Sequence, residues 1–407
     1  MSRAGGVLAA ASLLLAACAA PTARRAHEPD WPTPTLAPAE LVASFPDSAS
    51  VQRRLLSGAH DTRDAAAVRI GLQRLAAMGY APGQQTLDTL SVYLPEAEMT
   101  ALRQRFGANG ARVQASRLFT SLPGQHRLVE GIAWDARTGR LFAATVVSRA
   151  LLVREARGWR AIDGLEAGSL FSLAIDPRRR LLWATSGVVE QTPNPEGAFR
   201  SVIAVDLATL RPVRRLAALG EGSPADIALA PDGTIYASDP NSGAIYRARP
   251  GDTTLSVFVA PGRLRSPQGL VLSADGRLLY VADYGYGLAE VHLADGSVSR
   301  LESDANTMLD GIDGLYPWRG GLLAIQNGTS PRRILWLSLS QDGERISGVR
   351  VLESNHPDWG EPTLGFVRRN DFLYVADAQW ERYGAGGALR GAAPVRPTTI
   401  RLLRPGP

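Results

Sequence analysis

Residues 267–283 read Pro267-Gln-Gly-Leu-Val-Leu-Ser-Ala-Asp-Gly-Arg-Leu-Leu-Tyr-Val-Ala-Asp283. Two short apolar runs flank Ser-Ala-Asp-Gly, and an Asp-Gly pair is typical of a tight turn between antiparallel strands. The stretch therefore predicts a β-hairpin with a polar side chain, Gln268, near the start of its first strand.

The same pattern occurs six times between about residue 112 and the end of the chain. In each copy a polar residue opens a short apolar strand, and a turn and a second strand follow. The copies are spaced roughly 40–50 residues apart, a period typical of β-propeller blades. The sequence thus predicts an all-β six-bladed β-propeller over residues 111–407, with a small N-terminal α-helical segment before it. The opening residues are Glu130, Ser172, Asp226, Gln268, Asp313 and Thr363.

A propeller of this kind needs a device that closes the ring, because an open stack of sheets would leave unpaired strand edges. Residues 397–403 predict a last strand, and residues 112–119 contain a strand that could pair with it. We therefore expect the two ends of the propeller to share one blade.

The N-terminus contains the single cysteine of the chain, Cys18, at the end of the motif Leu15-Ala-Ala-Cys18. The apolar run at 7–17 is too short to span a bilayer but suits a signal peptide. The motif looks like a bacterial lipobox, in which this cysteine is lipidated. We predict a lipoprotein signal at 1–18 and a lipid-anchored protein on the periplasmic or extracellular face of a bacterial cell envelope. The alternative is an ordinary secretory signal that contains a cysteine.

Two segments separate the signal from the propeller. Residues 19–50 contain six prolines, which disfavour helix, so we predict an extended tether there. Residues 51–110 predict two or three helices, including one over 63–78 capped by Asp61 or Thr62 and one over 95–107.

Composition excludes several classes of chemistry. All 44 basic residues are Arg, which rules out a Schiff-base lysine and a P-loop lysine. A single cysteine rules out an intrachain disulfide and a cysteine metal cluster. The net charge of +5 is small for 407 residues, so we predict no nucleic-acid partner.

The residues that open the blades are the first candidates for a functional site. In a propeller the first strand of each blade lines the central channel, and its first residues reach the mouth. Carboxylates at Glu130, Asp226 and Asp313 and an amide at Gln268 are oxygen ligands that suit a hard divalent cation such as calcium. The alternative is that these side chains only cap turns and loop amides.

Four motifs resemble the regucalcin/gluconolactonase/luciferin-regenerating-enzyme family over residues 120–404. They are Glu130-Gly-Ile132, Ala225-Asp226, Pro267-Gln-Gly269 and Asp313-Gly-Leu315. That family is a six-bladed propeller and includes metal-dependent lactonases. The resemblance implies that Glu130 and Asp313 are metal ligands and that Asp313 is the general base or nucleophile. Gln268 replaces a family asparagine, and Ala225-Asp226 replaces an Asn-Asp pair.

Three further stretches are similar to a bacterial gluconolactonase-like branch of this family: 325–328, 361–365 and 378–380. They place Asn327, Glu361 and Trp380 among the substrate-binding candidates, and Tyr284 joins them because it directly follows the second strand of its hairpin. The resemblance implies hydrolysis of a small lactone or ester with a divalent cation, calcium or else zinc or manganese. The competing hypotheses are a non-catalytic binding propeller that uses the same mouth, and a scaffold whose helical segment docks protein partners.

Overall fold

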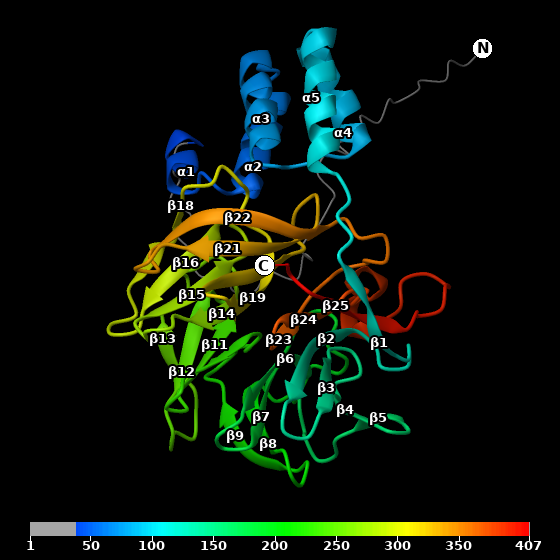
Figure 1. Ribbon diagram of the computed structural model, residues 1–407, viewed down its shortest axis with the longest axis vertical. Helices are drawn as coiled ribbons and strands as arrows, with labels where there is room; N and C mark the ends of the chain where they lie inside the picture. Colours follow the sequence, from blue (N-terminus) through cyan, green and yellow to red (C-terminus); the bar gives the residue numbers. More distant parts are fainter. Residues whose placement is uncertain (1–37, 407) are drawn as a thin grey trace, which may run out of the picture.

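The strands of the computed structural model form six sheets around a central axis, which confirms the predicted six-bladed β-propeller (Figure 1). The structure describes residues 38–406. The predicted signal peptide with Cys18 and the first part of the tether, up to residue 37, lie outside the described residues.

Blades 1 to 3 are four-stranded antiparallel sheets in which strand order follows chain order. Blade 1 is β2 (Val129–Asp135), β3 (Arg140–Thr145), β4 (Leu151–Glu155) and β5 (Gly158–Ala161). Blade 2 is β6 (Ser169–Asp176), β7 (Leu181–Gly187), β8 (Ser201–Asp206) and β9 (Pro212–Ala217). Blade 3 is β10 (Ile227–Leu229), β11 (Ile235–Asp239), β12 (Ala244–Ala248) and β13 (Ser256–Val259).

Blade 4 has the same strand order, with β14 (Pro267–Leu272), β15 (Leu278–Asp283), β16 (Gly287–His292) and β17 (Val298–Arg300). Blades 5 and 6 depart from this order. Blade 5 is β19 (Ile312–Trp318), β20 (Gly321–Gln326), β21 (Arg333–Leu339) and β22 (Arg345–Ser354), with β18 (Glu302–Ser303) parallel to β22. Blade 6 is β23 (Gly365–Arg368), β24 (Asp371–Val375) and β25 (Thr398–Leu403), with β1 (Ser116–Leu122) as its outer strand.

The ring closes through blade 6, as the sequence predicted. Strand β1 pairs antiparallel with β25, from Ser116 opposite Leu403 to Leu122 opposite Thr398. The first strand of each blade contacts the first strand of the next, and β23 contacts β2. The N-terminal strand thereby removes the open edge that a linear stack would leave.

Glycines let the inner strands approach one another closely. A Cβ added to Gly131 of β2 would lie 2.2 Å from the Phe171 carbonyl oxygen of β6. A Cβ on Gly269 of β14 would lie 2.5 Å from the Leu315 nitrogen of β19. These close contacts explain why glycine follows the polar residues at 130 and 268. They also bring those polar side chains together at the mouth.

The helical segment stands at the edge of the ring beside β18 and β22 (Figure 1). None of the helices in residues 38–406 has the length and apolarity that crossing a membrane requires. The elements are α1 (Pro38–Ser44), α2 (Ala49–Asp61), α3 (Ala65–Ala77), α4 (Gln84–Leu90), the 3-10 turn η1 (Ser91–Tyr93) and α5 (Glu96–Asn109).

The predicted tether was wrong for residues 38–50, because helices occupy most of this stretch. Pro38 is the first residue of α1, where its fixed φ suits a helix and its missing N–H costs nothing. Ser48 caps α2 by accepting a hydrogen bond from the Val51 N–H. The predicted cap at Asp61 or Thr62 was also wrong, since α2 ends there and Asp64 caps α3.

Candidate active site

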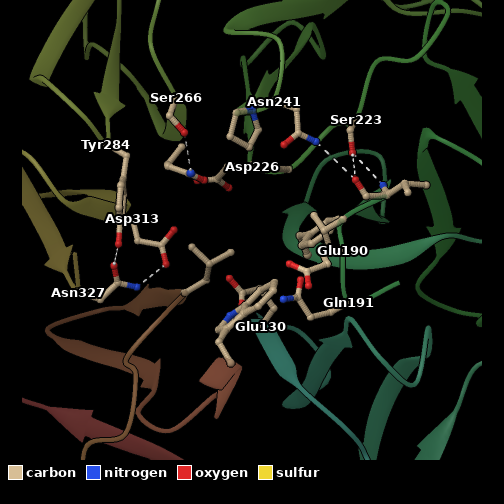
Figure 2. A pocket seen from close by; sticks show the side chains of 18 of the residues that line it. Glu130, Glu190, Gln191, Ser223, Asp226, Asn241, Ser266, Tyr284, Asp313 and Asn327 are labelled. Atoms are coloured by element: carbon tan, nitrogen blue, oxygen red, sulfur yellow. Dashed lines mark hydrogen bonds between the residues drawn. The ribbon is translucent and has the colours of Figure 1, made fainter. Parts of the chain in front are cut away.

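A pocket of about 690 Å3 opens at the mouth of the propeller, where the inner strands begin (Figure 2). A volume of this size suits a small organic molecule. The eight residues predicted as metal ligands or substrate contacts line it, whereas Ser172 and Thr363, which were also predicted to reach the mouth, do not. The eight are Glu130, Asp226, Gln268, Tyr284, Asp313, Asn327, Glu361 and Trp380.

The wall opposite Asp313 and Asn327 consists of residues that the sequence analysis did not single out. Figure 2 shows Glu190 and Gln191 there, with Ser223 and Asn241 nearby. They lie in connections between strands, outside the hairpin pattern that repeats in each blade. The signal that could have found Glu190 and Asn241 is their position shortly after the second strands β7 and β11, since Tyr284 was selected by the same criterion.

Asp313 is held by a short chain of hydrogen bonds. The Asn327 amide Nδ2 donates to Asp313 Oδ2 at 2.7 Å and to the Pro362 carbonyl oxygen at 2.9 Å. The Tyr284 hydroxyl donates to Asn327 Oδ1 at 3.0 Å. Because the Pro362 carbonyl oxygen can only accept a hydrogen bond, the Asn327 amide nitrogen must lie on the side of Pro362 and Asp313. Asn327 therefore donates to the carboxylate and favours its ionised form.

Glu130 is buried and fixed from blade 6. The Trp380 indole Nε1 donates to Glu130 Oε2 at 2.7 Å, and Trp380 lies in the connection between β24 and β25. The Thr363 hydroxyl donates to the Glu130 backbone carbonyl at 2.9 Å. These contacts bind the first blade to the last one across the point where the ring closes.

Asp226 is directed into its own blade and the neighbouring ones. The Ser172 hydroxyl of blade 2 donates to Asp226 Oδ1, and the Ile227 N–H donates to the same oxygen at 2.7 Å. The backbone N–H of Leu270 in blade 4 is a further donor to this carboxylate. Asp226 therefore ties three blades together at the mouth.

The carboxyl groups of this pocket hold their protons unusually well. Burial raises the pKa of Asp313 to about 7, against the hydrogen bond from Asn327. Burial also raises the pKa of Asp226 to about 6 and of Glu361 to about 7. The pKa of Glu130 lies well above its ordinary value because of burial and then the charge of Asp313. Not one of the residues that line the pocket is Arg or His, so the carboxylates repel one another without a basic side chain among them.

This donor set fits a hard divalent cation, although not with the full predicted shell. The candidate ligand atoms are all oxygens, and a cation would relieve the repulsion between Glu130 and Asp313. Within residues 38–406, however, no group of three or more His, Cys, Asp or Glu side chains is arranged to hold one metal ion. Asp226, which is bound to Ser172 and backbone N–H groups, therefore does not complete a three-carboxylate cluster. The ligands that fit are Glu130 and Asp313, with Gln268 as a neutral oxygen donor.

Comparisons with known proteins place the chain by fold alone. No protein-family model and no curated protein matches the sequence. Among solved structures, virginiamycin B lyase from Staphylococcus aureus is 12% identical with a TM-score of 0.50, covering 71% of this chain and 99% of its own. A putative gluconolactonase is 17% identical with a TM-score of 0.47, and the match covers 71% of this chain and 91% of the gluconolactonase. A luciferin-regenerating enzyme is 14% identical with a TM-score of 0.46, and the match covers 68% of this chain and 92% of that enzyme.

Proposed function

We propose that this protein is a hydrolase that cleaves a small lactone or ester at the propeller mouth with the help of one divalent cation. The observation that carries the proposal is the pair Glu130 and Asp313. Glu130 comes from blade 1 and is buried, Asp313 comes from blade 5 and is half-buried, and both line one pocket. Burial and then the charge of Asp313 raise the pKa of Glu130. A carboxylate pair that lines one pocket without a basic neighbour there is suited to bind a cation or to move a proton.

Asp313 has the role of general base in this proposal. Asn327 occupies one of its oxygens, so the carboxylate is held in a fixed orientation toward the pocket. It takes a proton from the water whose oxygen attacks the carbonyl carbon. The bond from that carbon to the ester oxygen then breaks, and the proton passes to the departing oxygen. The products are a carboxylic acid and an alcohol, which remain in one molecule when the substrate is a lactone.

Glu130, Asp313 and Gln268 would hold the cation, with calcium as the first choice and zinc or manganese as alternatives. When bound, a divalent cation polarises the carbonyl and stabilises the negative charge that develops on its oxygen. The substrate itself lies against Tyr284, Asn327, Glu361 and Trp380, all of which line the pocket. We also propose that Cys18 carries a lipid that anchors the protein in the cell envelope.

The test is a binding measurement followed by a substrate screen. Terbium is a calcium surrogate whose luminescence is excited through a nearby indole, and Trp380 is bonded to Glu130. We expect sensitised terbium luminescence that calcium displaces and that Glu130→Gln and Asp313→Asn abolish. Lactones and aryl esters are then screened with calcium, zinc and manganese.

Glu290→Gln is the matched control for these variants. Glu290 is also a buried carboxylate with a raised pKa, but it lies on β16 and does not line the pocket. We expect this variant to bind terbium like the wild type. Hydrolysis that persists after chelation and in Asp313→Asn would contradict the proposal.

A non-catalytic ligand-binding propeller is the second candidate. It is favoured by the absence of a three-carboxylate group within the described residues and by the two departures at Ala225 and Gln268. In that case the lactone and ester screen gives no turnover, with or without a terbium signal.

A further inference from the structure

The helical segment, residues 38–110, is attached to the same end of the propeller as the pocket. The Ser48 hydroxyl donates to the Gly285 carbonyl oxygen at 3.0 Å. The Phe45 ring stacks on the Tyr286 ring, with 4.0 Å between the ring centroids. The Ala81 N–H donates to the Ser330 carbonyl oxygen at 2.8 Å. These propeller residues follow the second strands of blades 4 and 5, so they lie beside the mouth. The segment nevertheless supplies none of the residues that line the pocket.

Asp310 receives the N-terminus of α2. Its side chain is fully buried, and it accepts the Ala49 N–H at 2.9 Å on Oδ1 and the Ser50 N–H at 2.8 Å on Oδ2. The first N–H groups of a helix have no partner within the helix, and a carboxylate there is stabilised by the helix dipole. Ser48 caps the next N–H, that of Val51. A carboxylate of the propeller and a hydroxyl of the helical segment thus share one helix end.

The backbone next to Asp310 is hydrogen-bonded both to the helical segment and to blade 5. From the helical segment, the Met78 and Asp47 carbonyl oxygens accept the N–H groups of Met308 and Leu309 at 3.1 and 2.9 Å. From blade 5, the Gln326 amide donates to the carbonyl oxygens of Met308 and Asp310 at 3.0 and 2.7 Å. Residues 308–310 are therefore held between the helices and the end of β20.

The segments that begin at Met308 and Gln326 continue to Asp313 and to its hydrogen-bond partner Asn327. The Gly328 N–H donates to the Gly311 carbonyl oxygen at 3.0 Å, and Gly311 adopts a positive φ of 67°. A Cβ on Gly311 would lie 2.8 Å from the Gly328 carbonyl carbon, so the two segments touch. Asn327, between Gln326 and Gly328, donates to Asp313. Residues 308–313 and 326–328 consequently form one hydrogen-bonded unit with Asp310 at one end and Asp313 at the other.

We infer that docking of the helical segment fixes Asp313, and that Asp310 is the positioning residue through which it acts. Without α2, the Asp310 carboxylate would lose both of its N–H donors from the helix, and residues 308–313 would lose one of the two sets of contacts that hold them. The helical segment is then part of the support of the site although it does not line it. The positioning of Asp313 by the helical segment does not depend on the proposed function. Its expected effect on cation affinity does rest on that proposed function.

Hydrogen exchange of the full chain tests the position. In Asp310→Asn one acceptor oxygen becomes an NH2 group that faces a backbone N–H. Phe45→Ala weakens docking at a contact outside the 308–313 unit. We expect peptides containing 311–313 and 326–328 to exchange about fivefold to tenfold faster in both variants, the size expected for about one lost hydrogen bond. Peptides from β7 in blade 2 should not change, which separates a local effect from global destabilisation.

Arg103→Gln is the control, because it breaks a salt bridge between Arg103 and Asp88 within the helical segment and leaves the docking contacts intact. Terbium affinity provides the second readout, and we expect it to fall by about fivefold in both docking variants but not in the control. Unchanged exchange at 311–313 and 326–328 in both Asp310→Asn and Phe45→Ala would overturn the inference. If the wild type binds no cation while exchange responds as expected, the proposed function fails and the positioning role stands.

Discussion

The Trp380 indole nitrogen donates a hydrogen bond of 2.7 Å to Glu130 Oε2, although 250 residues separate the two in sequence. Trp380 enters the site from the connection between β24 and β25, and Glu130 opens the first blade. A donor aimed at one carboxylate oxygen fixes the rotation of the carboxyl group. Contacts of this type typically tune how well a ligand residue binds a metal ion.

Trp380→Phe is expected to weaken cation binding without unfolding the protein. Phenylalanine keeps most of the apolar contact but removes the N–H, so the Glu130 carboxylate loses its orientation. We expect about a tenfold loss of calcium affinity, measured by calorimetry because the variant also removes the terbium sensitiser. Trp336→Phe is a matched control, since its indole N–H has no hydrogen-bond partner among residues 38–406 and it lies in blade 5 outside the pocket lining. Equal affinities in both variants would show that the indole N–H does not act on the site.

The raised pKa of Asp313 predicts an unusual pH dependence for the cation-free protein. Its pKa rises from 3.8 to about 7 on folding, so between these values the folded state holds a proton that the unfolded state has lost. Stability therefore falls as pH rises through this window, by up to about 1.4 kcal/mol per pH unit for one such group. Denaturant unfolding of chelated protein at pH 5, 6, 7 and 8 measures this slope.

Asp313→Asn should reduce that slope, because the amide does not titrate. Calcium should reduce it as well, because binding an ionised carboxylate favours the deprotonated folded state. A stability that rises steadily from pH 5 to pH 8 in the chelated wild type would contradict the predicted burial of these carboxyl groups.

The fold was predictable because each blade repeats a local pattern. The hairpin at 267–283 is specified by its own apolar runs and its Asp-Gly turn, and the strand at 398–403 by its apolar alternation. The helix at 38–44 and the first two residues of the helix at 49–61 lie where the sequence analysis predicted an extended tether. Proline density was read as an extended tether, whereas Pro38 stands at the one helix position that tolerates it.

The candidate site was predictable in part for a related reason. Glu130, Asp226, Gln268 and Asp313 hold equivalent places in the repeat, so topology brings them to one mouth. The orientation of each side chain depends on contacts between distant residues, such as that of Asp226 with Ser172. No local pattern encodes such a contact, so equivalent positions in the repeat do not fix how the four side chains are oriented.

Blades 1 and 2 are joined by an ion pair whose loss should be costly. Arg180 donates to both oxygens of Asp135, at 2.8 and 2.6 Å, and only 2% of the Asp135 side chain is exposed. Asp135→Asn leaves the Arg180 guanidinium without its counter-ion, although the Arg180 side chain is 23% exposed and water can partly compensate. We expect a clear loss in the free energy of unfolding, smaller than for a fully buried pair. Arg160→Gln, which breaks the exposed Arg160–Glu155 pair, should have a much smaller effect, because water screens that pair.

The Asp135 pair also has a defined pH signature. The hydrogen bond from Arg180 holds the pKa of Asp135 far below its ordinary value. Its contribution is present above the unfolded pKa of the carboxyl group and is lost as pH falls below that value. The stability difference between wild type and Asp135→Asn should therefore shrink from pH 6 toward pH 2. A difference that stays constant over this range would show that the pair acts through packing and not through charge.

Lipid attachment at Cys18 is tested by phase partition of the protein made in a bacterial host. The wild type is expected in the detergent phase and Cys18→Ser in the aqueous phase, because an acylated N-terminus adds large apolar chains to an otherwise polar surface. Mass spectrometry of the mature N-terminus provides the second measurement. A wild-type chain that begins after residue 18 with no added lipid would favour the ordinary secretory signal.

Two glycine-to-alanine changes separate close strand packing from ordinary helix propensity. In Gly131→Ala the new Cβ would lie 2.2 Å from the Phe171 carbonyl oxygen, and backbone cannot move as a flexible side chain can. We expect a loss of about 3 kcal/mol in the free energy of unfolding, together with weaker cation binding because Glu130 is the preceding residue. In Gly107→Ala the new Cβ would meet no atom of the described residues within 4 Å beyond its chain neighbours and the backbone of its own helix, α5. This change should therefore stabilise the protein by about 0.5–1 kcal/mol. Denaturant unfolding of both variants distinguishes the two effects. A Gly131→Ala protein as stable as the wild type would mean that the inner strands of blades 1 and 2 are not packed as closely as the structure has them.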